Sequence, residues 1–277
     1  MEYRGRNALI TGASSGIGEA FARELAARGM ALLLTAYPAE EARLQAIGQE
    51  LRDRHGVRVE VVPLDLSERE GAARLQAGAD ALGFEPDLLV NSAGLGAGGD
   101  FASAPLDRQL TMIHVNVEAL VALCGLYLPR LAARRDGSII NIVSTSAFEP
   151  MPYMAVYAAS KAFVLRFSEA LWAENHRRGV RVVALCPGPV QTAFHQAAGA
   201  GEPGSGLRRG ARRRYLTAEH VVEAGLNGLE RDRPTVVRRA PGLAPLYYGA
   251  TVVGRLAPRR LRLMTSERLN RWYFEQR

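Results

Sequence analysis

Short apolar runs alternate with longer amphipathic segments along most of this 277-residue chain. The runs are rich in Val, Ile and Leu, which is typical of strands that are covered on both faces of a parallel sheet. They predict strands at Asn7–Thr11, Ala31–Ala36, Val57–Leu64, Asp87–Asn91, Ser138–Ser144, Val180–Cys186 and Thr235–Arg238. The segments between them predict helices at Ile17–Arg28, Ala39–His55, Ser67–Leu82, Leu106–Arg134 and Tyr153–Arg178, and a last helix that Thr217 caps and that ends at Glu230.

This regular alternation of strand and helix predicts the fold class. Repeated right-handed crossovers give an α/β protein with a Rossmann-type doubly wound parallel sheet and three layers, α/β/α. We expect one main domain over residues 1–240, in which the glycine- and arginine-rich residues 190–216 form a mobile lid. Residues 241–277 interleave apolar residues with arginines and predict a basic amphipathic extension. We expect it to pack on the body or join a dimer, with contact to an anionic membrane as the alternative.

The composition is that of an ordinary globular protein, with 48% apolar and 23% charged residues. Neither a signal-peptide pattern nor a run of about 18 uninterrupted apolar residues is present, so we expect no leader and no transmembrane helix. Cys124 and Cys186 lie in apolar surroundings, which predicts buried free thiols and a cytoplasmic location. His and Cys lack the spacing of metal ligands, so we expect no metal.

The net charge of +7 is unevenly distributed. Residues 207–277 contain 16 arginines and 6 acidic residues, whereas residues 1–206 carry a slight excess of acids. The densest run, Arg208–Arg214, is typical either of a solvated segment or of a surface that attracts phosphate, anionic lipid or an acidic protein. Both interpretations remain open. No nucleic-acid-binding motif occurs, so we expect no nucleic acid partner.

A glycine-rich turn follows the first predicted strand and opens the first predicted helix. Gly12 permits the turn, Gly16 lets a ligand approach the backbone, and Gly18 allows tight packing. The free N–H groups at the start of a helix bind pyrophosphate well, so the turn predicts a dinucleotide site. Ligands of such sheets bind beyond the carboxyl ends of the strands. Further candidate residues lie at those ends, namely Asp65, Asn91–Gly94, Ser144 and Pro187–Thr192.

Tyr157 and Lys161 are the most informative pair of residues outside the turn. Lys161 is the only lysine among 35 Lys and Arg residues. On a helix, a spacing of four places both side chains on one face. A nearby ammonium group favours the phenolate and lowers the phenol pKa toward the range of a useful proton donor. The pair therefore predicts acid–base chemistry, with a surface lysine beside a packed tyrosine as the alternative.

Taken together, the motifs closely resemble those of the short-chain dehydrogenase/reductase family over about residues 5–240. The matching motifs are Thr11-Gly12-x3-Gly16-x-Gly18, Asp65-Leu66, Asn91-Ser92-Ala93-Gly94, Asn116, Ser144, Tyr157-x3-Lys161 and Pro187-Gly188-x3-Thr192. Ser144 precedes Tyr157 by thirteen residues, the usual interval in the family. Ser92 departs from the usual second asparagine, so a stabilising side-chain contact is expected to be missing there.

The resemblance implies a role for each of four catalytic residues. Tyr157 would exchange a proton with the substrate oxygen, and Ser144 would orient that oxygen. Lys161 would bind the cofactor ribose and lower the Tyr157 pKa, and Asn116 would hold a water that links Lys161 to solvent. The implied cofactor contacts are Gly12, Ser14, Ser15, Gly16, Ile17, Gly18, Ala36, Tyr37, Asp65, Leu66, Asn91, Ala93, Gly94, Tyr157, Lys161, Pro187, Gly188, Val190 and Thr192.

The resemblance also bears on the choice between NADP and NAD. Relatives that prefer NAD place an acidic residue at the end of the second strand, where this chain has Ala36. Relatives that prefer NADP commonly place arginine next, where this chain has Tyr37. The missing carboxylate favours NADP over NAD. Arg4, Arg6 or Arg43 would then have to supply the cation for the 2′-phosphate.

The segment between Ser144 and Tyr157 is expected to line the substrate pocket. Phe148, Met151 and Met154 would form an apolar, adaptable wall, and Ser144 and Tyr157 would contact the reacting group. We therefore expect oxidoreduction between a nicotinamide and the carbonyl or alcohol group of a bulky apolar small molecule. The alternatives are reduction of a 3-oxoacyl group on coenzyme A or a carrier protein and, less favoured, a non-catalytic dinucleotide sensor. Relatives commonly pair through their long helices, so we expect a homodimer or homotetramer.

Overall fold

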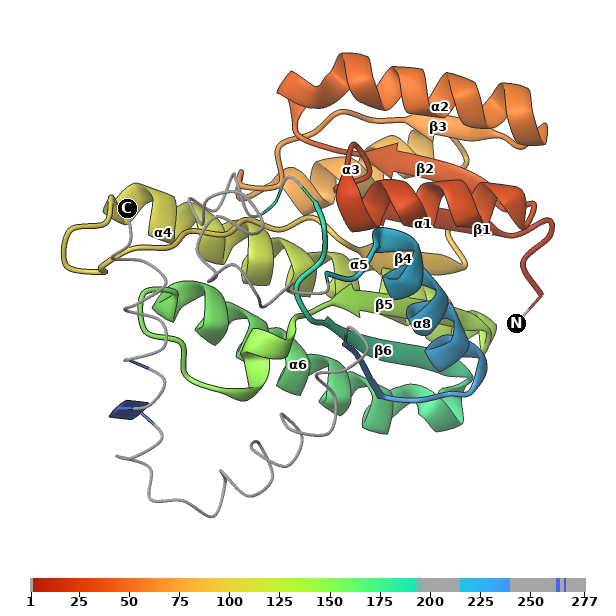
Figure 1. Cartoon of the computed structure of the whole chain (residues 1–277). Helices are drawn as coiled ribbons and strands as arrows, with labels where there is room; N and C mark the ends of the chain where they lie inside the picture. Colours follow the sequence, from red (N-terminus) through yellow and green to blue (C-terminus); the bar gives the residue numbers. More distant parts are fainter. Residues whose placement is uncertain (1, 193, 195–214, 240–262, 265–266, 268–277) are drawn as a thin grey trace.

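The computed structural model describes residues 2–192, 194, 215–239, 263, 264 and 267. Several expectations lie outside these residues: the Arg208–Arg214 run, most of the expected lid at 190–216, and nearly all of the extension at 241–277. In the part that is described, strands and helices alternate as the apolar pattern predicts (Figure 1).

Seven parallel strands form one sheet in the order β3-β2-β1-β4-β5-β6-β7. The strands are β1 (Asn7–Thr11), β2 (Ala31–Thr35), β3 (Val59–Val61), β4 (Leu88–Asn91), β5 (Gly137–Ile142), β6 (Val180–Pro187) and β7 (Thr235–Arg238). The strand order reverses direction at β1 and β4, so the sheet is doubly wound, as predicted. Parallel pairing brings all the carboxyl ends of the strands to one edge, where the predicted site residues gather.

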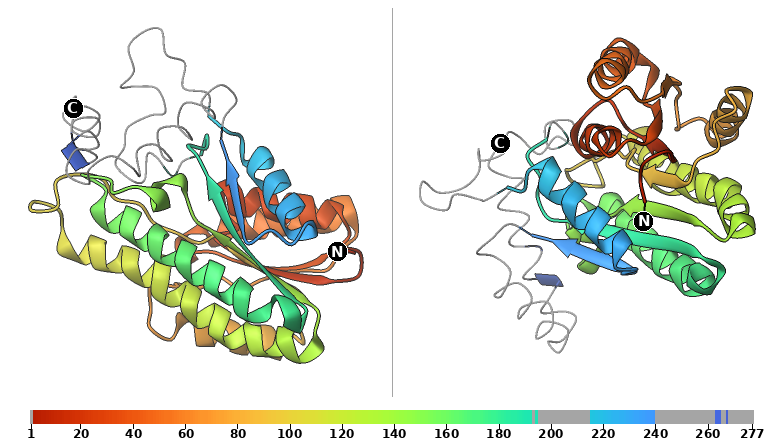
Figure 2. Two further views of the ribbon diagram at one scale, coloured as in Figure 1. Left: turned by 90° about the horizontal axis from the view of Figure 1, so that it is seen from below. Right: turned by 90° about the vertical axis from the view of Figure 1, so that its right-hand side faces the viewer.

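Helices cover both faces of this sheet (Figure 2). The helices are α1 (Gly16–Ala27), α2 (Glu41–His55), α3 (Gly71–Ala81), α4 (Leu106–Ile113), α5 (Leu120–Arg134), α6 (Ala155–Asn175) and α8 (Ala218–Glu230), with the short turns η1 (Pro38–Glu40), η3 (Thr145–Phe148) and η4 (His176–Arg178). One apolar cluster joins α1, α2 and α8 to residues such as Ile10 and Leu34. A second cluster joins α3, α5 and α6 to alternate residues of the same strands, such as Leu9 and Leu33. Successive side chains of a strand point to opposite faces of the sheet, so each face packs against its own set of helices. The three predicted layers result.

Within the described residues, most elements match their predicted bounds to within two residues, and the larger differences are in β3, in α3, which begins at Gly71 rather than Ser67, and in α6. Strand β3 covers only Val59–Val61, although the N–H groups of Val62 and Leu64 continue to donate to the carbonyl groups of Leu34 and Ala36, each at 2.9 Å. Helix α6 begins at Ala155 rather than Tyr153, because Tyr153 has a φ of 65° that no right-handed helix accommodates.

The long helix predicted at Leu106–Arg134 consists of α4, a π-helical segment η2 (His114–Ala119) and α5. By length and composition it is the one helix in the described ranges that could cross a membrane. Buried positions make up 44% of its most apolar stretch. Its residues Leu123, Tyr127 and Leu131 pack on the sheet, which is the arrangement of a core helix. Asn116 lies in the π-helical segment, a kind of irregularity that frequently occurs at functional sites.

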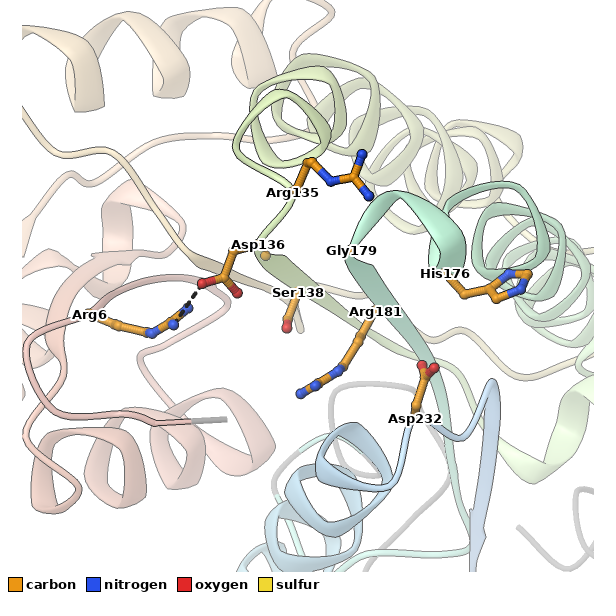
Figure 3. Close-up of a pocket in the computed structure, with 9 residues that line it drawn as sticks. Arg6, Arg135, Asp136, Ser138, His176, Gly179, Arg181 and Asp232 are labelled. Atoms are coloured by element: carbon orange, nitrogen blue, oxygen red, sulfur yellow. Dashed lines mark hydrogen bonds and ion pairs between the residues drawn. The ribbon is translucent and has the colours of Figure 1, made fainter.

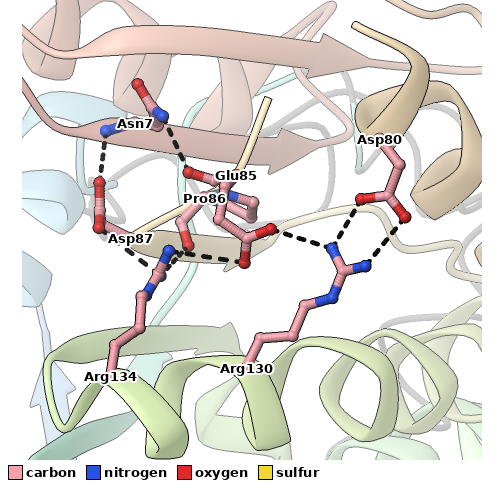
Figure 4. A network of polar contacts seen from close by, with 7 residues as sticks. All are labelled: Asn7, Asp80, Glu85, Pro86, Asp87, Arg130 and Arg134. Atoms are coloured by element: carbon pink, nitrogen blue, oxygen red, sulfur yellow. Dashed lines mark hydrogen bonds and ion pairs between the residues drawn. The ribbon is translucent and has the colours of Figure 1, made fainter. Parts of the chain in front are cut away.

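A network of polar contacts fixes the far end of α5 against the start of β4 (Figure 4). Arg130 forms a two-pronged ion pair with Asp80 at the end of α3 and also contacts Glu85. Arg134 lies beside Asp87 and Glu85 and donates to the Pro86 carbonyl. These contacts are partly exposed, so each contributes little to the free energy of folding. Together they set the position of the long helix that carries Asn116.

Candidate active site

The glycine turn connects β1 to α1 with the geometry that the sequence predicts. Gly12 has a φ of 64°, and a Cβ atom there would lie 2.9 Å from the Ala93 backbone. A Cβ atom on Gly18 would lie 2.1 Å from the Gly12 carbonyl oxygen, so no side chain fits. Gly16 has a φ of 59° and faces Thr192, whose methyl group would lie 3.2 Å from an added Cβ. The turn thus brings the first and last predicted cofactor segments together.

The start of α1 is suited to hold an anion. Its N-cap residue, Ser15, makes no side-chain hydrogen bond to the helix. The first backbone N–H groups therefore lack the usual capping partner and, with the helix dipole, favour a phosphate oxygen. Ser14 is buried beside them, and Ile17 packs against the core below.

Thr11 joins the glycine turn to the next site segment, a role that the sequence reasoning missed. Its hydroxyl oxygen accepts hydrogen bonds from the N–H groups of Ser92 and Ala93, each at 3.0 Å. These bonds fix the loop after β4 against the loop after β1. Thr11 belongs to the Thr11-Gly12-x3-Gly16-x-Gly18 motif, and its position directly before Gly12 was the sequence feature that could have indicated this role.

Asn91 ends β4 at the carboxyl edge of the sheet, and its side chain is buried. It is 3% exposed, and its amide nitrogen donates to the Oδ1 atom of Asn141 on β5 at 2.8 Å. The Asn141 amide in turn donates to Ser168 of α6 at 2.9 Å. We predicted Asn91 as a cofactor contact; its amide nitrogen belongs to this buried network, whereas its carboxamide oxygen has no hydrogen-bond partner among the described residues, so this stays a prediction. Its function is to pin β4 to β5, because a buried polar group needs a partner.

Ser144, Tyr157 and Lys161 come together at the carboxyl end of β5. Ser144 caps η3, and its hydroxyl oxygen accepts from the Ser146 N–H at 3.1 Å. Lys161 is 6% exposed, and its Nζ atom donates to the carbonyl oxygen of Ile142 at 2.9 Å. The same Nζ lies 5.9 Å from the centre of the Tyr157 ring. The structure therefore unites the three predicted catalytic side chains.

Burial controls the acid–base behaviour of this pair. It raises the pKa of Tyr157, whereas the side chains of Ser144 and Ser146 act in the opposite direction. Burial also lowers the pKa of Lys161 to about 8. We expected Lys161 to lower the Tyr157 pKa below its usual value, and the direction is the opposite, because loss of hydration disfavours the phenolate more than its neighbours favour it.

Ser146 is a second residue that the sequence reasoning did not select. Its hydroxyl oxygen is buried and has no hydrogen-bond partner among the described residues. It lies close enough to Tyr157 to affect the phenol pKa. A buried hydroxyl without a partner is costly unless a ligand satisfies it, which fits a polar substrate atom at this position.

Asn116 shapes the rim of the site. Its amide nitrogen donates to the Leu95 carbonyl at 2.9 Å and to Ser160 at 3.1 Å, and its oxygen accepts from the Leu95 N–H at 2.8 Å. Both polar atoms thus already have protein partners. A Cβ atom on Gly94 would lie 3.3 Å from the Asn116 oxygen and 3.6 Å from the Lys161 ammonium. Asn116 thereby holds the loop that approaches Lys161.

The residues of the predicted apolar wall do not all lie together. Met154 packs with Tyr157 in a small apolar cluster that also contains Ala97, Met112 and Phe194. The rings of Tyr157 and Phe194 are 5.6 Å apart. Phe148 instead packs against the core cluster of α5 and α6, and Met151 is half-buried in the preceding loop. Ala97, Met112 and Phe194 were missed because they come from three separate segments.

Five of the remaining predicted cofactor residues lie beside the sheet's carboxyl edge. Asp65 accepts from the Ser67 N–H at 2.8 Å, which shapes the turn after β3, and Leu66 is buried. Val190 pairs with Leu216 in an isolated bridge. The N–H group of Gly188, which follows Pro187, donates to the Arg238 carbonyl at 2.8 Å.

The end of β2 lacks a carboxylate, as the sequence indicates. Ala36 is buried, and Tyr37 is 59% exposed. Of the three candidate cations, Arg6 binds Asp136 at the amino end of the sheet. Arg4 packs against Gly29 at that same end. Arg43 follows β2 and pairs with Glu19 of α1 at 3.0 Å, so it alone is on the correct side.

Comparison with known proteins agrees with this arrangement. The family model described as short chain dehydrogenase matches residues 6–203. The very-long-chain 3-oxoacyl-CoA reductase of Anas platyrhynchos is 37% identical over 190 residues, which is 67% of this chain and 60% of that protein. The chain therefore spans less than two thirds of the length of this relative.

Solved structures extend the comparison over nearly the whole chain. A short-chain dehydrogenase from Sphingobium yanoikuyae in complex with NADPH is 31% identical, with a TM-score of 0.77, and covers 94% of this chain and 95% of its own. A short chain dehydrogenase/reductase from Burkholderia phymatum in complex with NAD is 26% identical, with a TM-score of 0.76, and covers 92% and 95%. With its glycine turn, its doubly wound sheet and the meeting of Ser144, Tyr157 and Lys161, the chain belongs to the short-chain dehydrogenase family of oxidoreductases.

Proposed function

We propose that this protein transfers a hydride between a nicotinamide dinucleotide and the carbonyl or secondary alcohol group of a bulky apolar substrate. The observation that carries the proposal is the apolar cluster of Met154, Met112 and Phe194 around the buried Tyr157 ring. Such a wall binds an apolar body, while one polar group fixes the reacting oxygen.

The dinucleotide supplies the hydride when it is bound, and the protein supplies positioning and a proton. The uncapped start of α1 at Gly16 would hold the pyrophosphate. Lys161, held by the Ile142 carbonyl, would bind the ribose hydroxyls.

Tyr157 would deliver its phenolic proton to the substrate oxygen as charge develops there, and Ser144 would donate a hydrogen bond to the same oxygen. The raised pKa of Tyr157 keeps its proton in place for reduction. A ribose hydroxyl and the Lys161 ammonium beside the phenol would stabilise the phenolate that reduction leaves.

We propose NADP as the preferred cofactor. A carboxylate at the end of β2 would repel a 2′-phosphate, and Ala36 removes that repulsion. Arg43 is the cation available on this side, although its ion pair with Glu19 must open or be shared. Of the two similar structures, one contains NADPH and the other NAD, so the comparison does not favour either cofactor. The proposal therefore rests on the residues of this chain.

The experiment that tests the function is a panel of ketones of increasing size, assayed with NADPH and with NADH. We expect kcat/KM to rise with the apolar area of the ketone, because burial contributes about 25 cal/mol per Å². Equal rates for acetone-sized and large ketones would contradict the proposed pocket.

A second candidate function is reduction of a 3-oxoacyl thioester. The likeness to a very-long-chain 3-oxoacyl-CoA reductase favours it. A long acyl chain would suit the same apolar wall, so the two candidates differ in the headgroup. If the thioester is the substrate, a 3-oxoacyl-CoA will exceed the matched 3-oxo ester without coenzyme A by at least tenfold in kcat/KM.

We also propose that the protein assembles as a homodimer or homotetramer. Leu106, Leu110 and Ile113 repeat along one face of α4 and are 61%, 45% and 39% exposed, and Phe163 of the neighbouring α6 is 47% exposed. An exposed apolar stripe of this kind is typical of a protein interface. Both described cysteines are buried free thiols, which supports a reducing compartment such as the cytoplasm.

A further inference from the structure

The hydroxyl group of Ser146 is buried at the centre of the site, and the chemistry described so far does not use it. Ser146 is 9% exposed, and its Oγ atom has no hydrogen-bond partner among the described residues. A buried hydroxyl group without a partner lowers the stability of a protein, so its presence needs an explanation.

The backbone of Ser146 holds Ser144 in place without help from the Ser146 side chain. The Ser146 N–H group donates to the Ser144 hydroxyl oxygen at 3.1 Å, where Ser144 caps the turn η3. Because that oxygen accepts from the backbone, the Ser144 hydroxyl hydrogen is left for another acceptor. An alanine in place of Ser146 would keep this N–H contact. What the serine adds is therefore its own hydroxyl group.

That hydroxyl group lies beside the phenol of Tyr157. The turn η3 packs against α6, the helix that carries Tyr157. Burial raises the pKa of Tyr157, and the side chains of Ser144 and Ser146 both act to lower it. A neutral hydroxyl group lowers the pKa of a phenol by donating a hydrogen bond to the phenolate. Since the Ser146 hydroxyl has no partner in the structure, it can donate when the phenolate forms.

Charged groups near the phenol are few within the described residues. Lys161 places its Nζ atom 5.9 Å from the centre of the Tyr157 ring, and burial lowers the pKa of this ammonium group to about 8. Cys186 of β6 is close enough to act on Lys161. Burial raises the pKa of the Cys186 thiol to about 12, so it stays neutral over the working range of pH.

The charged residues of the other elements packed against α6 lie away from the phenol. Those of α4 and η2 are exposed, and those of η4 follow the other end of the helix: Asp107, Arg108, His114, Glu118, His176, Arg177 and Arg178. Arg181 and Asp232 line a cavity of about 370 Å³ at the amino ends of β5 and β6 (Figure 3). None of these groups, nor Glu149 after η3, contributes to the pKa of Tyr157. Within the described protein, the phenolate therefore depends on Lys161 and the two serine hydroxyls.

We propose that Ser146 is a positioning residue for the proton transfer, whose hydroxyl group donates a hydrogen bond to the Tyr157 oxygen once that oxygen has lost its proton. The proposal rests on the proposed function and deepens it. In reduction, the O–H bond of Tyr157 breaks and a new O–H bond forms on the substrate oxygen, while the hydride supplied by the dinucleotide forms the new C–H bond. Ser144 remains directed to the substrate oxygen, and Ser146 serves the phenolate that is left.

This assignment explains why an unpartnered hydroxyl is kept. A donor that is satisfied only when charge has developed stabilises that state relative to the resting one. An oxygen of the substrate is the other acceptor that could reach Ser146 during the reaction. The phenolate is favoured, because Tyr157 is the group that the fold itself places beside Ser146.

The first test is the pH dependence of kcat/KM in Ser146→Ala and the parent. Oxidation of a secondary alcohol needs the phenolate, so its rate rises with pH through the ionisation of Tyr157. Loss of a hydrogen bond to a charged group disfavours the phenolate, and the midpoint should move up by about one pH unit. Reduction of the ketone needs the phenol, so the pH above which it slows should move up in parallel. The thermal midpoint of Ser146→Ala should equal or exceed that of the parent, because the variant removes only an unpartnered hydroxyl.

The second test reads the ionisation without turnover. The protein is labelled with ¹³C at the tyrosine Cζ atoms and saturated with whichever of NADP⁺ and NAD⁺ binds more tightly. The Tyr157 signal is assigned by its absence in Tyr157→Phe and followed by NMR as the pH rises. Its midpoint should again be about one pH unit higher in Ser146→Ala. A protein that turns over no ketone would contradict the proposed function but would still give this midpoint.

The matched control is Thr145→Val, which removes a half-buried hydroxyl from the same turn η3. Thr145 does not contribute to the Tyr157 pKa, so the midpoint should stay at the parental value. The proposal is overturned if Ser146→Ala leaves the midpoint unchanged, if Thr145→Val moves it equally, or if Tyr157 stays protonated in the parent until the protein unfolds. A higher KM with an unchanged midpoint would assign Ser146 to the substrate instead and would equally overturn it.

Discussion

Lys161 donates a hydrogen bond to the carbonyl oxygen of Ile142, two residues before Ser144, at 2.9 Å. The single lysine of the chain is thus tied to the strand that carries the serine of the site. The same α6 helix carries Tyr157, so one contact fixes the relative positions of three side chains from two elements. A guanidinium group is larger and planar and would not fit this position in the same way.

Replacing Tyr157 by Phe should abolish turnover while leaving the fold intact. The variant removes only the hydroxyl group that would exchange the proton, and general acid catalysis contributes about 10²- to 10⁴-fold. We expect kcat with the best ketone to fall by that factor, while the dissociation constant of NADPH, measured by fluorescence titration, changes less than about threefold. An unchanged kcat would contradict the proposed role of Tyr157 in proton transfer.

The stability of the protein should depend on pH through Lys161. Burial places its pKa at about 8, below the ordinary 10.5, so the unfolded chain binds the proton more tightly. Burying the charged form therefore costs stability below pH 8, and this cost is relieved as the pH rises from about 8 to 10.5. The difference corresponds to about 3 kcal/mol.

Comparison with Lys161→Met isolates this effect, because all other titrating groups are shared. The free energy of unfolding of the parent relative to the variant should increase by about that amount between pH 7.5 and 10.5, as measured by urea denaturation. Parallel pH curves for the two proteins would contradict the assignment.

The buried amide network should be strongly coupled. Asn141→Leu removes the acceptor of the Asn91 amide nitrogen and the donor to the Ser168 hydroxyl oxygen, which keeps its own bond to the Val164 carbonyl. A buried donor left without its partner costs about 1–3 kcal/mol, so we expect a loss of that size in the free energy of unfolding. Ser168→Ala should cost less in the Asn141→Leu background than in the parent, and a double-mutant cycle measures this. Strict additivity would show that the network is not cooperative.

Cofactor preference should respond to charge at the end of β2. Ala36→Asp introduces a carboxylate where a 2′-phosphate would lie, so the ratio of kcat/KM for NADPH to that for NADH should fall at least tenfold. Ala39→Asp adds the same charge at an exposed position three residues later and should change the ratio much less. An equal effect of the two variants would mean that general repulsion, rather than a local contact, sets the preference.

The apolar stripe on α4 should hold subunits together. Leu110→Glu places a charge in its centre and should shift the molar mass, measured by light scattering after size exclusion, toward that of a monomer. Leu82→Glu, at an exposed leucine that lies after α3, is the matched control and should leave the mass unchanged. A parent protein that is already monomeric would refute the assembly.

The sequence by itself determined the alternation of strands and helices, the three layers, the glycine turn and the candidate side chains of the site. These features depend on local patterns, because the period of a strand or helix and the freedom of Gly12 are properties of short segments. The order of the elements then placed the candidate residues at one edge of the sheet.

Only the tertiary structure decided the features that depend on burial and on contacts between distant segments. It joined the Asn91 amide to Asn141, made Thr11 the link to Ala93, and brought Ala97, Met112 and Phe194 to Tyr157. It also reversed the expected direction of the Tyr157 pKa, since the hydration that a phenolate loses is set by everything packed around it and not by the lysine four residues away.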